Sequence, residues 1–124
     1  MEKKRKELTL NEYQKEAMTT CMKTSENFSY MFLNLVGEIG EFASKIAKHI
    51  RKDKASIEES KLFLFNVSEE ENEELQKEAG DILWQLSGLC TVMGWDLEYI
   101  AKMNLDKLAS RRDRNVIDGN GDNR

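Results

Sequence analysis

The fold is decided by one stretch of the sequence, residues 32–50, which reads FLNLVGEIGEFASKIAKHI. Its apolar residues recur every three or four positions, the spacing that puts side chains on one face of an α-helix. These residues are Phe32, Leu35, Val36, Ile39, Phe42, Ala43, Ile46, Ala47 and Ile50. We therefore predict a helix from about Tyr30 to Arg51 whose apolar stripe is buried in the core.

The same helix carries an acidic step, Glu38 and Glu41, at one edge of its apolar stripe. A second step of the same spacing, Glu78 and Asp81, flanks the apolar face of another predicted helix. Carboxylates three residues apart share one side of a helix and repel each other. Four such groups brought together need a cation, and Mg²⁺ takes oxygen ligands and partners phosphates. A solvated helix face has the same spacing, so the pattern alone leaves both interpretations open.

Two glycines, Gly40 and Gly80, favour a functional site over a solvated face. Each lies inside an acidic step, and a glycine within a helix costs about 1 kcal/mol relative to alanine. Close approach of another helix or of a phosphate would explain why a glycine is present there. Apolar residues follow both steps and would hold the carboxylates rigidly.

Capping signals indicate further helices. Thr9 with Glu12 and Ser68 with Glu71 have the spacing of capping boxes, in which a hydroxyl and a carboxylate satisfy backbone N–H groups at a helix start. We predict that the first helix extends to about Lys23.

The third and fourth helices follow from apolar spacing and from the residues between them. Gly94 is suited to end the third helix and Asp96 to cap the fourth. The apolar face of the third helix consists of Leu75, Ala79, Ile82, Leu83, Leu86, Leu89, Cys90 and Met93. That of the fourth consists of Leu97, Ile100, Ala101, Leu105 and Leu108. Four main helices predict an all-α, four-helix bundle-like fold.

A connector, residues 52–67, interrupts the helical pattern. It contains a continuous apolar run, residues 62–65, which could be a strand, a helical turn or a contact surface, because periodicity alone does not distinguish them.

Composition limits the class of protein. The 124 residues are 34% charged and 40% hydrophobic, with no proline and a net charge of −4. These values indicate one domain, residues 1–124, with flexible ends at 1–8 and 118–124. The negative charge argues against nucleic-acid binding, and no segment has the length of a membrane span or the pattern of a secretory signal. Cys21 and Cys90 lack disulfide or zinc spacing, so we expect reduced thiols in a cytoplasmic protein.

A di-iron carboxylate bundle is the chemical alternative for paired acidic helices. That site requires Glu-x-x-His on two helices. The chain has one histidine, His49, and the residue three positions before it is Ile46. A di-iron site is therefore excluded for lack of ligands.

The acidic steps and their surroundings resemble the MazG family of nucleoside triphosphate pyrophosphohydrolases, from about residue 9 to the end. The stretches that carry the resemblance are residues 35–42 (LVGEIGEF), 78–84 (EAGDILW), 104–111 (NLDKLASR) and the glycine-rich end 118–124 (DGNGDNR). The resemblance implies hydrolysis of an NTP or dNTP to the monophosphate and pyrophosphate. It also implies an oligomer, a homodimer or homotetramer.

The resemblance also implies roles for particular residues. Glu38, Glu41, Glu78 and Asp81 match the Mg²⁺ ligands, and Mn²⁺ is an expected substitute. Glu38 and Glu41 are the candidate catalytic carboxylates, since one left partly free of metal could orient or deprotonate water. Asn104, Lys107 and Arg111 match nucleotide contacts, and we assign Lys45 to the same substrate site.

Two alternatives remain from the sequence. One is a related all-α pyrophosphatase, such as a dimeric dUTPase or a phosphoribosyl-ATP pyrophosphohydrolase. The other is a non-catalytic helical interaction domain that uses the apolar run 62–65 as its contact surface. The base pocket is undetermined: Tyr13, Gln14, Phe28 and Trp84 are candidates, although core packing is the simpler expectation for the aromatic residues.

Overall fold

The structure, a computed structural model, describes residues 7–119 and residue 121. Its elements are α1 (Leu10–Met18), the 3-10 helix η1 (Lys23–Ser25), α2 (Phe28–Arg51), β1 (Ser56–Glu58), β2 (Lys61–Phe63), α3 (Glu69–Val92) and α4 (Leu97–Asp113). The predicted all-α class with four main helices is confirmed. The flexible ends predicted at 1–8 and 118–124 lie mostly outside the described residues.

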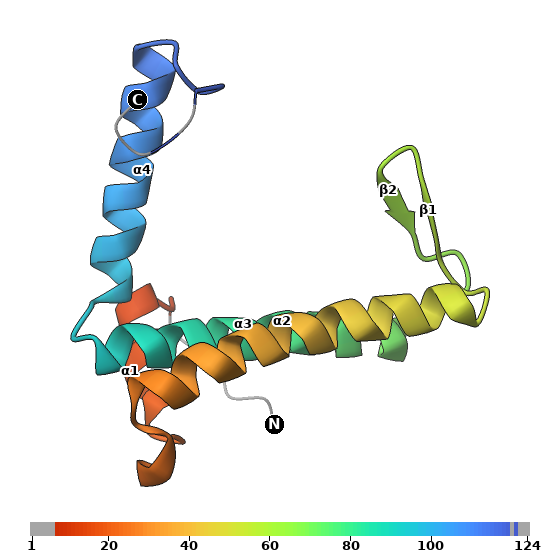
Figure 1. Cartoon of the computed structure of the whole chain (residues 1–124), viewed down its shortest axis with the longest axis horizontal. Helices are drawn as coiled ribbons and strands as arrows, with labels where there is room; N and C mark the ends of the chain where they lie inside the picture. The colour runs from red at the N-terminus through yellow and green to blue at the C-terminus, as the bar shows by residue number, and fades with distance from the viewer. Residues whose placement is uncertain (1–6, 120, 122–124) are drawn as a thin grey trace.

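The two longest helices, α2 and α3, lie side by side as an antiparallel pair, which forms the largest helix interface of the chain (Figure 1). α1 packs against one end of α3. α4 extends away from the pair at a steep angle and contacts α1, and the β-hairpin projects from the opposite end of the pair (Figure 1). One chain therefore forms an open arrangement in which α4 does not lie along the other helices.

The stripe predicted to be the buried face of α2 is mostly exposed, which corrects the sequence-based expectation. Phe32, Val36 and Ile39 are 47%, 58% and 51% exposed. The side of α2 that is covered instead contains the fully buried Met31 and the partly buried Glu38. Only one long helix lies beside α2, so only one of its two apolar sides can be covered within the chain.

The same correction applies to α3. Leu75 and Cys90 are buried as predicted, whereas Leu83, Leu86 and Met93 are more than a third exposed. Among the described residues the buried apolar side chains are few: Met31, Ala55, Leu75, Cys90 and Leu97.

Capping explains where the helices begin. Both predicted capping boxes are present: Thr9 and Ser68 each accept a hydrogen bond from the backbone N–H three residues later. Asn27 caps α2, which therefore begins at Phe28, two residues before the prediction. Asp96 caps α4 as predicted.

α1 ends at Met18, five residues before the predicted end near Lys23. The hydroxyls of Thr19 and Thr20 donate to the carbonyl oxygens of Glu16 and Ala17 at 2.6 and 2.7 Å. These side chains satisfy carbonyl groups of the last turn, so the chain can leave the helix there.

Side chains of α1 fix the corner between α3 and α4. The Gln14 amide donates to Thr91 Oγ1 and to the Trp95 carbonyl, and its oxygen accepts from the Leu97 N–H at 3.0 Å. Asn11 Oδ1 accepts from the Glu98 N–H at 3.1 Å. Polar groups of the α3–α4 turn and of the first turn of α4 are thus satisfied from another helix. Gly94, with φ +73°, ends α3 as predicted.

The connector forms a two-stranded hairpin that pairs Ser56 with Phe63 and Glu58 with Lys61. Its two-residue turn is Glu59-Ser60, both with positive φ, 50° and 66°. Positive φ at both positions is the requirement of the hairpin turn that asparagine and glycine usually fill. Because the turn lacks asparagine and glycine, the sequence carried no hairpin signal, and the structure of the apolar run 62–65 could not be predicted from it.

The base of the hairpin is joined to α3 by an ion pair. Lys54 Nζ lies 2.5 Å from Glu71 Oε2, and His49 Nδ1 lies 3.7 Å from the same oxygen. The hydrogen bond from Lys54 is the largest cause that lowers the pKa of Glu71 to about 2. Glu71 therefore both caps α3 and positions the hairpin.

Gly88 and Gly80 on α3 provide a matched test of the α2–α3 packing. A Cβ at Gly88 would lie 2.4 Å from Met31 Sδ and 2.6 Å from Met31 Cε, whereas a Cβ at Gly80 would meet nothing within 4 Å. Both alanine variants gain the same helix propensity. The difference between their free energies of unfolding therefore measures the cost of the contact between the new Cβ at position 88 and Met31. We expect Gly88→Ala to be less stable than Gly80→Ala by about 1 to 3 kcal/mol in urea unfolding at equal protein concentration. Equal stabilities would show that Met31 moves without cost.

Candidate active site

Three of the four predicted metal ligands converge at the middle of the α2–α3 interface. One carboxylate oxygen from each of Glu38, Glu41 and Glu78 lies within 4.8 Å of the others. Glu78 is buried at 7% exposure, Glu38 is half-buried and Glu41 is exposed. Glu38 and Glu78 thus lie on the packed sides of their helices rather than at the predicted edge of the stripe. The three carboxylates together are called the acidic cluster below.

The acidic cluster is short of hydrogen-bond donors. Within the described part of the chain, Glu38 Oε2 and Glu78 Oε2 are buried and have no hydrogen-bond partner. Leaving a buried carboxylate oxygen unsatisfied is unfavourable. Such an arrangement is typical of a site that a cation completes.

The pKa of Glu38 shows the electrostatic consequence. Burial raises this pKa above its ordinary value, and the negative charges of Asp81, Glu41 and Glu78 raise it further. Glu38 therefore takes up a proton more readily than an isolated glutamate does.

Asp81, the fourth predicted ligand, lies outside the group of converging oxygens. Its charge nevertheless acts on Glu38 and raises the pKa of the Tyr13 hydroxyl, although burial is the larger cause of the Tyr13 shift. Asp81 is thus close to the cluster, on an exposed position of α3 that faces α1.

Lys45 is the cation that the chain itself supplies to the cluster. Its ammonium lies 2.5 Å from Glu78 Oε1. The hydrogen bond with Glu78 is the largest of the causes that raise the pKa of Lys45, so the ammonium stays charged. The predicted substrate residue is therefore adjacent to a predicted metal ligand.

A shallow basic pocket of about 230 Å³ continues from the cluster along α2. Glu41 and Lys45 border it together with Ser44, Lys48 and Arg51. Our sequence reasoning did not select Lys48 or Arg51. Their signal was the repeated spacing of three residues, from Lys45 to Lys48 and from Lys48 to Arg51, which places cations on the side of the helix that carries Glu41.

The other predicted nucleotide contacts are not brought to the cluster. Asn104, Lys107 and Arg111 lie on α4, which extends away from the α2–α3 pair (Figure 1). Arg111 is 5% exposed, and its Nη2 donates to the Gly121 carbonyl at 3.2 Å. Within the described residues of one chain, this guanidinium is thus bonded to Gly121 and is not directed to the acidic cluster.

The candidate base-pocket residues have mixed roles. Trp84 Nε1 donates to the Ala17 carbonyl at 3.0 Å and joins α3 to α1, and Gln14 fixes the α3–α4 corner. Phe28 stacks on Phe32 with ring centroids 5.6 Å apart, and both are about half exposed, so core packing is the wrong expectation for Phe28. Tyr13 borders Asp81.

The residues of the cluster fit a hard divalent cation. They provide only carboxylate oxygens, which Mg²⁺ and Mn²⁺ prefer, and two of these oxygens lack a partner. The fit rests on donor chemistry and on the crowding of negative charge.

Comparison with known proteins identifies the family of the chain. The family model of the MazG nucleotide pyrophosphohydrolase domain matches residues 26–116. The chain belongs to the MazG family, and the match spans both acidic helices. Among curated proteins, it is 39% identical over 99 residues to the Gene 37 protein of Mycobacterium phage L5, covering 80% of this chain and 78% of that protein. No solved structure matches the chain.

If the acidic cluster binds a cation, the melting temperature should depend on divalent metal. Mg²⁺ or Mn²⁺ at saturating concentration should raise the melting temperature by about 5 to 10 °C. Glu38→Gln should remove most of that increase. It should also raise the metal-free melting temperature by about 2 to 4 °C, since it relieves repulsion.

Differential scanning fluorimetry with and without EDTA measures both effects. Glu73→Gln, which removes an exposed carboxylate elsewhere on α3, is the control and should respond to metal like the wild type. A metal response that survives Glu38→Gln would place the cation elsewhere.

Proposed function

We propose that the chain is a Mg²⁺-dependent nucleoside triphosphate pyrophosphohydrolase that converts an NTP or dNTP to its monophosphate and pyrophosphate, with Mn²⁺ as a substitute metal. The observation that carries the proposal is the convergence of Glu38, Glu41 and Glu78 between two helices of a MazG domain. Asp81 is the fourth ligand in this proposal, because its charge acts directly on Glu38.

A cation held at these carboxylates would supply positive charge that offsets the negative charge developing during cleavage. The carboxylates would hold the cation, with Glu78 fixed most rigidly because it is buried. Glu38 is the preferred base. Its Oε2 has no partner within the described residues, which leaves that oxygen able to accept a proton.

The proposed reaction forms one P–O bond and breaks another. A water oxygen bonds to the α-phosphorus, its proton passes to the Glu38 carboxylate, and the α–β phosphoanhydride bond breaks. The bridging oxygen leaves with pyrophosphate. The ammonium of Lys45 and the cations of Lys48 and Arg51 border the cluster on one side, where they can bind the leaving phosphates.

We further propose that a second copy of the chain covers the apolar stripe of α2, giving a homodimer or homotetramer. The chain exposes 9991 Å², whereas a compact monomer of 14.4 kDa exposes about 6,800 Å². The excess of about 3,000 Å² is several times the roughly 800 Å² that one partner buries in a standard interface. Such an assembly can also bring Asn104 and Lys107 of a second copy toward an acidic cluster.

Other partners receive no support. The net charge of −4 disfavours nucleic acid as a partner. Within the described residues, every helix is too short or too polar to cross a bilayer.

The activity is tested with a panel of NTPs and dNTPs plus Mg²⁺, with pyrophosphate and orthophosphate assayed separately. We expect pyrophosphate and the monophosphate as products. Glu41→Gln and Asp81→Asn should each lower turnover about 100-fold or more because each removes a metal ligand. Glu73→Gln should retain wild-type turnover.

Each negative result has a definite meaning. Orthophosphate as the sole phosphate product would contradict cleavage between the α and β phosphates. Turnover of dUTP alone or of phosphoribosyl-ATP alone would indicate the corresponding related pyrophosphatase. No turnover would favour an interaction domain.

The assembly is tested by substitution within the exposed stripe. Val36→Glu should shift the protein to a smaller species in analytical ultracentrifugation, because it places a charge in the proposed interface. Ile57→Glu makes the same change at an exposed hairpin position and should leave the mass unchanged. A wild-type protein that sediments as a monomer at micromolar concentration would refute the proposed oligomer.

A further inference from the structure

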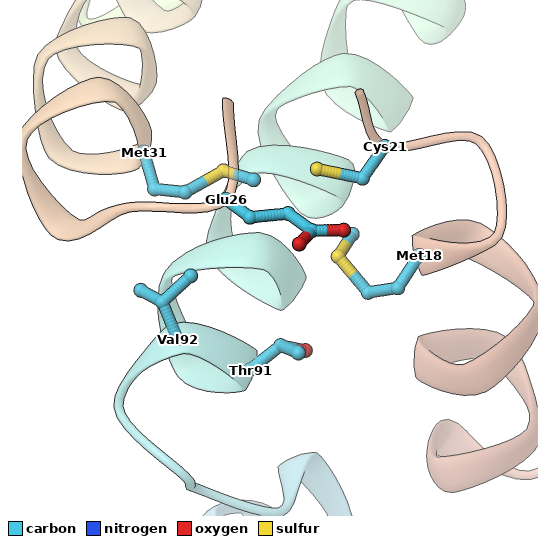
Figure 2. Close-up of a pocket in the computed structure, with 6 residues that line it drawn as sticks. All are labelled: Met18, Cys21, Glu26, Met31, Thr91 and Val92. Atoms are coloured by element: carbon cyan, nitrogen blue, oxygen red, sulfur yellow. The ribbon is translucent and has the colours of Figure 1, made fainter. Parts of the chain in front are cut away.

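A cavity of about 370 Å³ lies where α1, the segment after it, and the ends of α2 and α3 meet. The residues that line it are Met18, Cys21, Glu26, Met31, Thr91 and Val92. Figure 2 shows these side chains around a common space, with the sulfur-bearing side chains of α1, α2 and the connecting segment grouped near the Glu26 side chain. The acidic cluster contributes none of the lining residues.

The cavity and the acidic cluster lie on the same sides of both long helices. Met31 precedes Glu38 by seven residues, and Val92 follows Glu78 by fourteen, which are close to whole numbers of helical turns. Along α2 the separation is about 10 Å. This distance is similar to the length of a ribose that carries its α-phosphate.

α1 borders both places. Met18 at its end lines the cavity, and Tyr13, more than a turn earlier, is close enough to Asp81 for that charge to raise its pKa. One ligand that lies along α1 could therefore reach Asp81, beside the cluster, with one end and the cavity with the other.

The lining has the chemistry of a pocket for a flat heteroaromatic ring. The sulfur-bearing side chains of Met18 and Cys21 supply polarizable, apolar contacts of the kind that favour aromatic faces, with the buried Met31 behind them. Thr91 is already engaged, since its hydroxyl donates to the Ser87 carbonyl and accepts from Gln14. Glu26 is the one charged residue of the lining, and its carboxylate raises the pKa of the Cys21 thiol in addition to the larger effect of burial.

We propose that this cavity binds the base of the substrate and that the Glu26 carboxylate selects guanine. This inference rests on the proposed function, because the triphosphate at the acidic cluster fixes which end of the nucleotide enters the cavity. Guanine presents two adjacent donors, N1–H and the N2 amino group, which a carboxylate accepts as a pair.

The other bases fit this acceptor less well. Adenine and cytosine each place a lone-pair nitrogen beside the amino group, so one carboxylate oxygen faces an acceptor. Uracil and thymine place their single N–H between two carbonyl oxygens, which repel the carboxylate. Glu26 therefore gives the pocket a preference for guanine and makes uracil the poorest match.

The kinetic test compares GTP, ATP, CTP and UTP with Mg²⁺ for the wild type, Glu26→Gln and the control Glu73→Gln. The wild type should prefer GTP in kcat/KM. Glu26→Gln should lower kcat/KM for GTP by about 10- to 100-fold, mainly through KM, and change the value for the other three by less than about threefold. Within the described residues the Glu26 side chain makes no hydrogen bond or ion pair, and its backbone N–H donates to the Lys23 carbonyl whatever the side chain.

A second measurement needs neither metal nor turnover. Cys21 lines the cavity, so GMP bound there should slow its alkylation by iodoacetamide several-fold, and UMP should not. Mass spectrometry separates this site from Cys90, which is buried and serves as the internal control. Glu26→Gln should remove the protection by GMP.

The outcomes separate this inference from the proposed function. Equal turnover of all four triphosphates, or a GTP preference unchanged in Glu26→Gln, would overturn the base pocket while the pyrophosphohydrolase stands. If no triphosphate is hydrolysed, the proposed function fails. Protection of Cys21 by GMP would then still support the pocket, and its absence would overturn it.

Discussion

The structure depends on an interface between α2 and α3 that has carboxylates, not aliphatic side chains, at its centre. Glu38 and Glu78 are taken out of water and placed beside other negative charges, with one ammonium, that of Lys45, as compensation. Burial and repulsion both oppose this arrangement. Apolar packing on either side, at Met31 and Leu75, holds the helices together and keeps the charges in place. The close approach of these carboxylates lowers the stability of the fold, and the same close approach allows them to bind a cation.

Most of the apolar surface of the long helices is left uncovered by the chain itself. A pair of antiparallel helices can bury only the side that each turns to the other, and α4 leaves the pair instead of covering its outer side (Figure 1). The nucleotide contacts expected on α4 are consequently separated from the acidic cluster. A second copy that covered the stripe would supply both apolar packing and the missing polar groups.

α1 connects features that are distant in the sequence. Gln14 and Asn11 satisfy backbone groups at the α3–α4 corner, and the Ala17 carbonyl accepts a hydrogen bond from Trp84. Tyr13 lies near Asp81, beside the acidic cluster, and Met18 lines the cavity of Figure 2. A short helix with no fully buried residue thus positions the corner and borders both candidate binding regions.

Local sequence determined the helices, most of their ends and the chemistry of the site, because capping and periodicity act within a few residues of the chain. Thr9, Ser68 and Asp96 cap as their types and spacing indicate, and the acidic steps lie on facing helices. Only the tertiary structure decided which side of each helix is packed. α2 has apolar residues on two sides, and only one side can pack against α3. Helical spacing does not indicate which side that is. The Glu59-Ser60 turn and the cavity beside Glu26 also depend on contacts between distant segments, which no local pattern encodes.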